Sequence, residues 1–391
     1  MSARPSSPIL RVLDHLGRSS SEPGAGPVSL LEALATVRDP RKRRGVRHGF
    51  TAVLAIGACA VLTGARTFTA IAEWAQDLPV GVRTRLGLGR RVPSEATIRR
   101  VLQAVDAEAF DAAVSAWLSA RCQESAAPGP DRRAIAIDGK SARGARDADG
   151  RPVHLLAALS HASGVVLGQT VVDGRTNEIN AFAPLLDRID ITDAVITADA
   201  LHTQHRHAQY LTGRGAHYLL TVKGNQPTLH RQLRDLPWDQ VPVADRTHHK
   251  GHARIESRTV KLAAVTAGIG FPHAHLGIQV TRRRRALKAT RWHTETVYAV
   301  TDMTWAQIRA EHIAEAIRGH WAIENRLHWI RDVVFAEDHS QIRTGTGPAV
   351  MATLRNLAVS LHRLTGATNI AAACRYVSRH PNPELRVCHE R

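Results

Sequence analysis

Hydrophobic positions recur at helical spacing in the first third of the chain. Leucine and valine repeat at intervals of three and four residues within 30–37, and residues 51–64 form a longer apolar run. The pattern predicts an all-helical domain over residues 28–125, with 51–64 as a buried helix. The preceding residues 1–27 are rich in Ser, Pro and Gly, a composition typical of a flexible arm.

The hydrophobic period changes after residues 126–133, which contain Pro and Gly and are interpreted as a linker. Short apolar runs typical of buried strands then alternate with helical segments. These runs are residues 134–138, 154–160, 165–172, 194–200 and 217–224. Three consecutive strands followed by alternating helices and strands predict a mixed α/β sheet over residues 134–365. Within it, the β-rich stretch at about 225–302 is predicted to be an insertion, and residues 366–391 a C-terminal tail.

The chain is strongly basic, with 52 Lys and Arg against 35 Asp and Glu among 391 residues and a net charge of +17. This excess favours a polyanionic partner, and nucleic acid ranks first because an anionic membrane would also require an amphipathic anchor. Apolar residues make up 43% and charged residues 22%, which excludes wholesale disorder. Aromatic residues at 4% disfavour a protein that binds single strands mainly by stacking.

The four cysteines lie far apart in the sequence, at Cys59, Cys122, Cys374 and Cys388. They form neither a zinc knuckle nor a disulfide framework, so a reducing cytoplasm is the simplest compartment. The N-terminal residues lack the apolar core of a signal peptide, and the run 51–64 is too short to span a bilayer. We therefore expect a cytoplasmic protein without a membrane partner.

Three carboxylates stand where a metal site could form. Asp138 and Asp199 end the first and the fourth strand-like runs, and Glu324 lies within a predicted helix. Two aspartates at adjacent strand ends and a glutamate on a covering helix could hold two divalent metals about 4 Å apart. Magnesium fits because the ligands are hard oxygens. The spacing alone also allows turn or capping aspartates and a glutamate that pairs with Arg331 or another surface cation.

Cations near these carboxylates are candidates for contact with DNA. Lys140 and Arg143 follow the first aspartate, whereas Lys223 and Asn225 close the fifth run, so both pairs would line one sheet edge. His202 is interpreted as a DNA contact or as a support for Asp199, because the neighbouring histidines lack further zinc ligands.

Two arginine groups outside this edge are also candidates for DNA contact. They are the run Arg282, Arg283, Arg284 and Arg285, which has no compensating acid nearby in sequence, and Arg99 with Arg100 on a helix that would suit a major groove. Solvated surface positions remain the alternative for both groups. Trp321, Trp329 and Phe335 are interpreted as core residues.

Several ordered sequence motifs surround the carboxylates. They are AIDGKSARGA (136–145), ITADALHTQ (196–204), YLLTVKGNQPTL (218–229), RIESRTV (254–260) and HWAIENRLHWIRDVVFAEDHSQIRTG (320–345). Together they resemble the DDE transposases of bacterial insertion sequences, in particular the H-repeat-associated group. The segment DPRKRRGVRHGFTAVLAIGACAVLTGARTFTAIAEWA resembles the helical transposase-associated domain of that group. The resemblance covers about residues 29–365.

The resemblance implies a ribonuclease-H-like core in which Asp138, Asp199 and Glu324 are the catalytic residues and metal ligands. It also implies that residues 225–302 are inserted before the glutamate helix. The sequence departs from the wider family signature, because Ile317, His320 and Arg331 replace its tyrosine, arginine and lysine. Offsets of four and seven residues would place His320 and Arg331 on the helical face of the glutamate, where both could contact DNA phosphate.

The function implied is that of a transposase that binds element ends, cleaves DNA strands and transfers them to target DNA. Two Mg²⁺ ions would serve as cofactors, Mn²⁺ could substitute, and no small-molecule cofactor is expected. The partner is double-stranded DNA, with a homodimer in the DNA complex because two ends must be held together. The alternatives are a catalytically silent DNA-binding protein derived from a transposase and a metal-dependent nuclease without a joining step.

Overall fold

The computed structural model describes residues 29–379, apart from residues 45, 125–131, 147–149, 173–176, 252 and 266–268. The predicted arm 1–27, most of the predicted linker 126–133 and the last part of the predicted tail therefore lie outside the described residues. None of the helices within the described ranges is long and apolar enough to cross a membrane.

The described residues before the first strand are helical, as predicted. The helices are α2 (Leu30–Ala35), α3 (Phe50–Leu62), α4 (Phe68–Gln76), α5 (Val80–Arg85), α6 (Glu95–Leu102) and α7 (Ala107–Glu124). Side-chain caps fix several starts: Ser29 forms a capping box with Glu32, and the Ser94 hydroxyl accepts the Thr97 N–H. Every residue of α3 except Thr51 is buried, so this helix is the centre of the helical layer.

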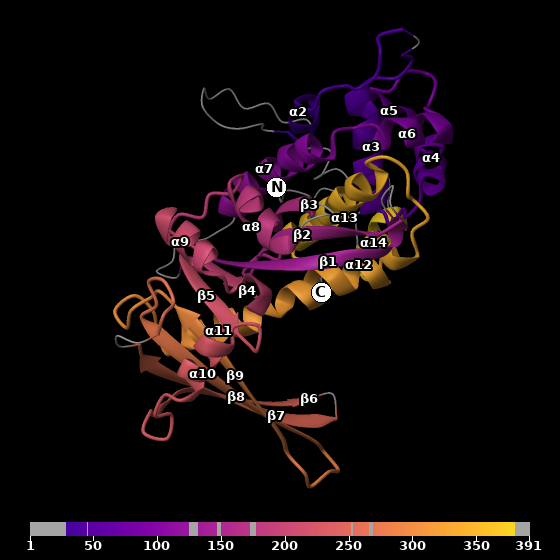
Figure 1. Cartoon of the computed structure of the whole chain (residues 1–391). Helices are drawn as coiled ribbons and strands as arrows, with labels where there is room; N and C mark the ends of the chain where they lie inside the picture. Colours follow the sequence, from indigo (N-terminus) through magenta and orange to yellow (C-terminus); the bar gives the residue numbers. More distant parts are fainter. Residues whose placement is uncertain are drawn as a thin grey trace, which may run out of the picture.

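A single nine-stranded mixed sheet follows (Figure 1), which confirms the predicted α/β class. Its strands are β1 (Ala134–Arg146), β2 (Pro152–Ser160), β3 (Val166–Val172), β4 (Val195–Ala198), β5 (His217–Val222), β6 (Val243–Gly251), β7 (Arg254–Ala264), β8 (Leu276–Ala286) and β9 (His293–Thr301). The order is β3-β2-β1-β4-β5-β9-β8-β7-β6. Strands β1, β4 and β5 run parallel to one another, and the other neighbouring pairs are antiparallel.

The residues expected to form an insertion extend this same sheet. Strand β9 pairs with β5, and β8, β7 and β6 add outward from it as long hairpins that reach away from the rest of the molecule (Figure 1). Their inner ends are apolar and buried, whereas their outer ends carry the basic residues. The insertion is therefore an arm that continues the sheet.

The remaining helices lie between the later strands in sequence or follow them. They are α8 (Glu178–Leu186), α9 (His205–Gly213), α10 (Pro227–Arg234), α11 (Ala310–His320), α12 (Trp329–Val333), α13 (Gly347–Leu364) and α14 (Ile370–Arg379). A π-helical turn, Glu324–His328, stands before α12, and short 3₁₀ turns span Ala200–His202 and Glu337–His339.

Helix α13 joins the helical layer to the sheet. All of its residues from Gly347 to His362 are buried, and it packs against α3 and α7 as well as against β2 and β3. Its His362 ring lies 3.0 Å from the Leu62 carbonyl oxygen, and the Thr353 hydroxyl donates to the buried Asp111 carboxylate at 3.1 Å. One apolar core therefore runs from Leu30 to Val377.

Candidate active site

Two neighbouring parallel strands bring Asp138 and Asp199 together. Strand β1 pairs with β4 up to Ile137 opposite Ala198, so Asp138 on β1 and Asp199, directly after β4, are the next residues of the two chain segments. Strand β1 does not end there, as the sequence suggested, but continues to Arg146 along β2. Asp199 leaves the sheet and starts a 3₁₀ turn, where its carboxylate accepts the Leu201 N–H at 2.9 Å.

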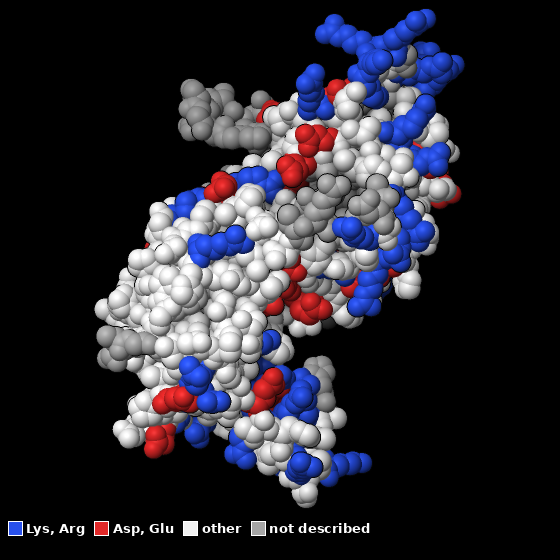
Figure 2. All heavy atoms as spheres, viewed as in Figure 1, with Lys and Arg blue, Asp and Glu red and all other residues white. Residues whose placement is uncertain are grey.

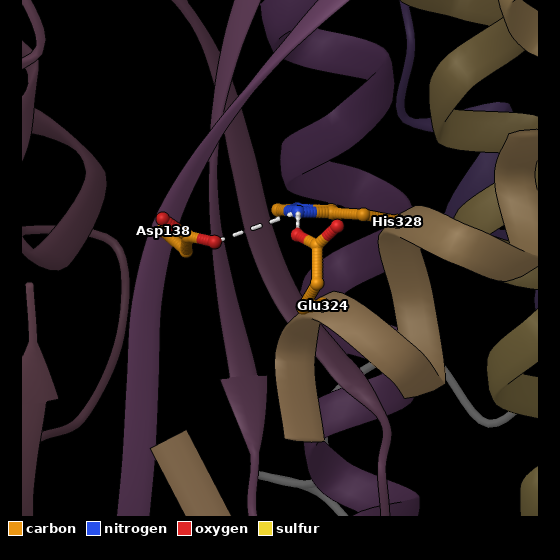
Figure 3. A group of neighbouring side chains, drawn as sticks. All are labelled: Asp138, Glu324 and His328. Carbon is orange, nitrogen blue, oxygen red and sulfur yellow. Dashed lines mark hydrogen bonds and ion pairs between the residues drawn. The ribbon is translucent and has the colours of Figure 1, made fainter. Parts of the chain in front are cut away.

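Glu324 lies near Asp138 in the π-helical turn Glu324–His328. The same turn contributes His328, which the sequence analysis did not identify as a candidate. Figure 3 shows the side chains of Glu324 and His328 directed toward Asp138. His328 Nδ1 lies 3.2 Å from Glu324 Oε2 and 3.5 Å from Asp138 Oδ2. One ligand atom from each of these three residues lies within 4.8 Å of the other two, a spacing that could accommodate a metal ion.

Negative charge is concentrated at this point of the sheet. Burial raises the pKa of Asp138 to about 7, with further increases from the neighbouring Asp199, Glu178 and Glu324 carboxylates. The hydrogen bond from His328 lowers the pKa of Glu324. A cation placed among these groups would relieve the repulsion and keep Asp138 ionised.

A cavity of about 310 Å³ separates the carboxylates from the inserted strands. Its lining includes Asp138, Asp199 and Glu324, together with Arg258, Arg282, Glu295 and neighbouring residues of β7–β9. Lys223, His320 and Trp321 also line it. The inserted arm thus forms part of the site.

Glu178 is a second functional candidate that the sequence did not indicate. Its carboxylate lies 2.6 Å from His154 Nε2 and 3.2 Å from His202 Nε2, so it links β2 to the turn that follows Asp199. It also covers Gly139, the residue after Asp138, so closely that a Cβ there would overlap it. Burial favours the neutral acid, but the two histidines lower the pKa of Glu178 to about 2.

The structure contradicts DNA contact by Arg331 and Lys140. The Arg331 side chain is 0% exposed, and its Nε donates to Glu337 Oε2 at 2.8 Å. Lys140 is 8% exposed, and its Nζ lies 2.7 Å from Asp332 Oδ2. The prediction that Arg331 shares a helical face with Glu324 is wrong. A π-helical turn interrupts the α-helical repeat between residues 324 and 328, and this rotates Arg331 away from the cavity.

His202 is also buried, with a side chain 1% exposed, so it offers no surface for a contact with DNA. Its contact with Glu178 agrees with the alternative that it supports Asp199. His320 lines the cavity, where its Nδ1 lies 3.3 Å from the Thr197 hydroxyl. Burial lowers the pKa of His320 to about 4, so its ring is neutral near pH 7.

The arginine run on β8 is partly neutralised. Glu256 on β7 lies 2.7 Å from Arg282 and 2.6 Å from Arg258, so the run has a compensating acid from the neighbouring strand. Arg283 and Arg284 are exposed. Figure 2 shows Lys and Arg gathered over the N-terminal helices and on the inserted arm, with few charges over the region of α8 and α9 between them.

The other candidate contacts differ in exposure. The Arg143 side chain is 82% exposed, and Lys223 and Asn225 are exposed after β5. Arg99 and Arg100 are exposed on α6, where Arg99 lies 3.5 Å from Glu95. Arg285 is half-buried beside Trp292. These residues are accessible to a ligand to different degrees.

The aromatic residues near the glutamate do not all belong to the core. Phe335 is buried, as predicted, but Trp321 is 58% exposed and Trp329 is 54% exposed. The prediction of core packing is wrong for both tryptophans. Trp321 instead lies at the cavity, with the Arg282 guanidinium 5.6 Å from its ring.

Two protein-family models match successive parts of the chain. Residues 31–118 match the model described as DDE_Tnp_1-associated, and residues 129–361 match the model described as Transposase DDE domain. The chain belongs to the family of transposases with a DDE domain.

Similar proteins that carry names indicate which group within this family the chain resembles. YncI of Escherichia coli O157:H7, named as a candidate transposase, is 30% identical over 354 residues, which cover 86% of this chain and 87% of that protein. YhhI of Escherichia coli K12, named as an H repeat-associated candidate transposase, is 28% identical over 346 residues, 85% of this chain and 89% of that protein. The resemblance to the H-repeat-associated group is confirmed.

Proposed function

We propose that this protein is a transposase that binds the ends of a DNA element, cleaves DNA strands and joins the freed 3′-hydroxyl to target DNA. The observation that carries the proposal is the meeting of three carboxylates at one cavity: neighbouring parallel strands supply Asp138 and Asp199, and the helical side supplies Glu324. The strand order β3-β2-β1-β4-β5, with β2 and β3 antiparallel, fits a ribonuclease-H-like core.

The donor set fits divalent cations. Carboxylate oxygens are ligands that Mg²⁺ prefers. Burial, and to a lesser extent the neighbouring Asp199, Glu178 and Glu324 carboxylates, raise the pKa of Asp138, and a bound cation would offset both effects. Asp138 and Asp199 would hold one ion, and Asp138 with Glu324 a second, with Mn²⁺ able to replace Mg²⁺. When bound, the ions would activate the attacking water or 3′-hydroxyl and stabilise the leaving oxygen.

The residues around the carboxylates would hold the DNA strand. Lys223 is exposed at the cavity and would bind the phosphate that is cut. The neutral His320 ring would donate or accept a hydrogen bond without adding charge. Glu178 would keep the turn after Asp199 in place through His202.

Exposed arginines on both sides of the site would bind the DNA backbone. Arg283 and Arg284 lie on the inserted arm, and Arg99 and Arg100 lie on α6. Arg143 and Asn225 would add contacts at the sheet edge. We expect binding to weaken steeply with salt, and two copies of the chain to hold two element ends together.

The test is strand cleavage of a labelled duplex that carries the flanking element end, with Mg²⁺ or with EDTA. We expect cleavage with Mg²⁺ that is lost, by at least about 100-fold, in Asp138→Asn and Glu324→Gln. Glu315→Gln, an exposed glutamate on α11, is the matched control and should cleave like the unaltered chain. A precleaved end with a free 3′-hydroxyl tests the joining step.

Each outcome separates the candidate functions. Binding to the end without cleavage in any variant would contradict the proposal and favour a DNA-occupying protein. Cleavage without joining would favour a nuclease. Equal cleavage by Asp138→Asn and by the unaltered chain would exclude this cavity as the active site.

A further inference from the structure

A ring nitrogen of His328 lies beside the carboxylates of both Asp138 and Glu324 (Figure 3). Its side chain is 4% exposed, so solvent does not compete for this position. A single Nδ1–H can form a well-aligned hydrogen bond with only one of the two carboxylates at a time. A cation could satisfy the nitrogen and both oxygens together.

Resting on the function proposed above, we infer that His328 Nδ1 is a direct ligand of the metal ion held by Asp138 and Glu324. The site is thus a mixed nitrogen and oxygen site.

The distances suit this arrangement. Ligand bonds of about 2.1 Å place neighbouring donors about 3.0 Å apart at a right angle and about 3.6 Å apart at 120°. The nitrogen lies 3.2 Å from Glu324 Oε2 and 3.5 Å from Asp138 Oδ2. Small side-chain rotations are therefore enough to bind an ion, without movement of the backbone.

The local backbone supports the same role. Glu324 and His328 are the first and last residues of the π-helical turn, in which the Trp329 N–H donates to the Glu324 carbonyl five residues before it. Such turns are rare and often occur at functional sites, because the wider turn costs stability that the fold must recover elsewhere. Here the turn brings both side chains toward Asp138.

A nitrogen ligand changes which metal the site prefers. Mg²⁺ selects oxygen donors, whereas first-row transition metals accept imidazole readily, and their affinities exceed that of Mg²⁺ at mixed sites. We therefore expect the ion bound by His328 to be held more tightly as Mn²⁺ than as Mg²⁺. Loss of the imidazole should weaken Mn²⁺ binding by at least about tenfold and Mg²⁺ binding by less.

The test is electron spin echo spectroscopy of the full chain with Mn²⁺, which detects ¹⁴N coupling from a directly bound imidazole. We expect coupling in the unaltered chain, its loss in His328→Gln and its retention in His320→Gln, a second histidine at the cavity. If His328→Gln does not fold, ¹⁵N-histidine labelling of the unaltered chain and of His320→Gln replaces it, since both should lose the ¹⁴N coupling on labelling.

Other results would overturn the inference. Bound Mn²⁺ without nitrogen coupling, or coupling that disappears in His320→Gln and persists in His328→Gln, would exclude His328 as a ligand. If Mg²⁺-dependent cleavage is intact in the same preparation, only this inference fails and the proposed function stands. Absence of both Mn²⁺ binding and cleavage would refute both.

Discussion

The buried ion group of Arg331, Glu337 and Arg355 allows a quantitative prediction about stability. Glu337 is 1% exposed and lies between two buried guanidinium groups, 2.8 Å from Arg331 and 2.7 Å from Arg355. Glu337→Gln keeps the shape of the side chain but leaves both cations without a carboxylate. Removing one partner of a buried ion pair costs about 3–5 kcal/mol, so we expect the free energy of unfolding to fall by about 4 kcal/mol.

The expected thermal shift follows from the size of the cooperative unit. An unfolding entropy of about 2.1 cal/mol/K per residue gives roughly 0.8 kcal/mol/K for a chain of this length, so a loss of about 4 kcal/mol lowers Tm by roughly 5 °C. The continuous core from Leu30 to Val377 supports a single transition. Glu315→Gln, an exposed glutamate on α11, should change stability by less than about 0.5 kcal/mol.

The same carboxylate predicts a pH dependence. Burial would raise the pKa of Glu337, but the Arg331 and Arg355 charges lower it from 4.5 to about 2. Because the pKa is lower in the folded chain, the stabilisation is complete above pH 4.5 and is lost as the pH falls through about 2. The difference between the unaltered chain and Glu337→Gln should therefore shrink by roughly 2 kcal/mol between pH 7 and pH 3.

Urea denaturation at several pH values measures both effects. If Glu337→Gln lowers the free energy of unfolding by less than about 1 kcal/mol at pH 7, the two arginines do not depend on the Glu337 carboxylate for their stability in the core. An equal loss at pH 7 and pH 3 would show that the loss of stability does not come from the charge of the Glu337 carboxylate.

Three smaller changes test other parts of the structure. Gly139→Ala should displace the Glu178 carboxylate and lower stability by about 1–3 kcal/mol in urea denaturation, whereas Gly213→Ala, where a Cβ meets open space, should have no such effect. Ala336→Gly should raise stability by up to about 1 kcal/mol, because Ala336 has a φ of +49°; a loss would show that the alanine is unstrained. Arg283→Gln should reduce the slope of log affinity against log salt by about 0.9 in DNA titrations, and an unchanged slope would exclude a phosphate contact.

The sequence predicted the mixed α/β class and the adjacency of the strands that carry Asp138 and Asp199 for sound physical reasons. Continuous apolar runs define the buried strands β1 and β4, and adjacent parallel strands must place Asp138 and Asp199 side by side. The helical N-terminal region was equally predictable from the spacing of its hydrophobic residues and from its capping residues.

Features that depend on contacts across the fold could not be predicted. Glu178 stands at an ordinary helix start, and only the folded sheet brings it to His154 and His202. Glu256 compensates Arg282 from the neighbouring strand, which a scan along the chain does not detect. Arg331 was misplaced because periodicity assumes an α-helix, whereas the backbone forms a π-helical turn.

The position of helix α13 late in the sequence affects how the chain folds during its synthesis. Its buried residues complete the packing of α3, yet roughly 285 residues separate the end of α3 at Leu62 from the start of α13 at Gly347. At a synthesis rate of about 5–20 residues per second, the ribosome takes roughly 15–60 s to cover that distance. During this time the apolar surface of α3 lacks its main partner and is open to chaperones or to aggregation. We therefore expect a chain truncated before α13 to leave the N-terminal helices without the partner that buries α3 in the complete fold.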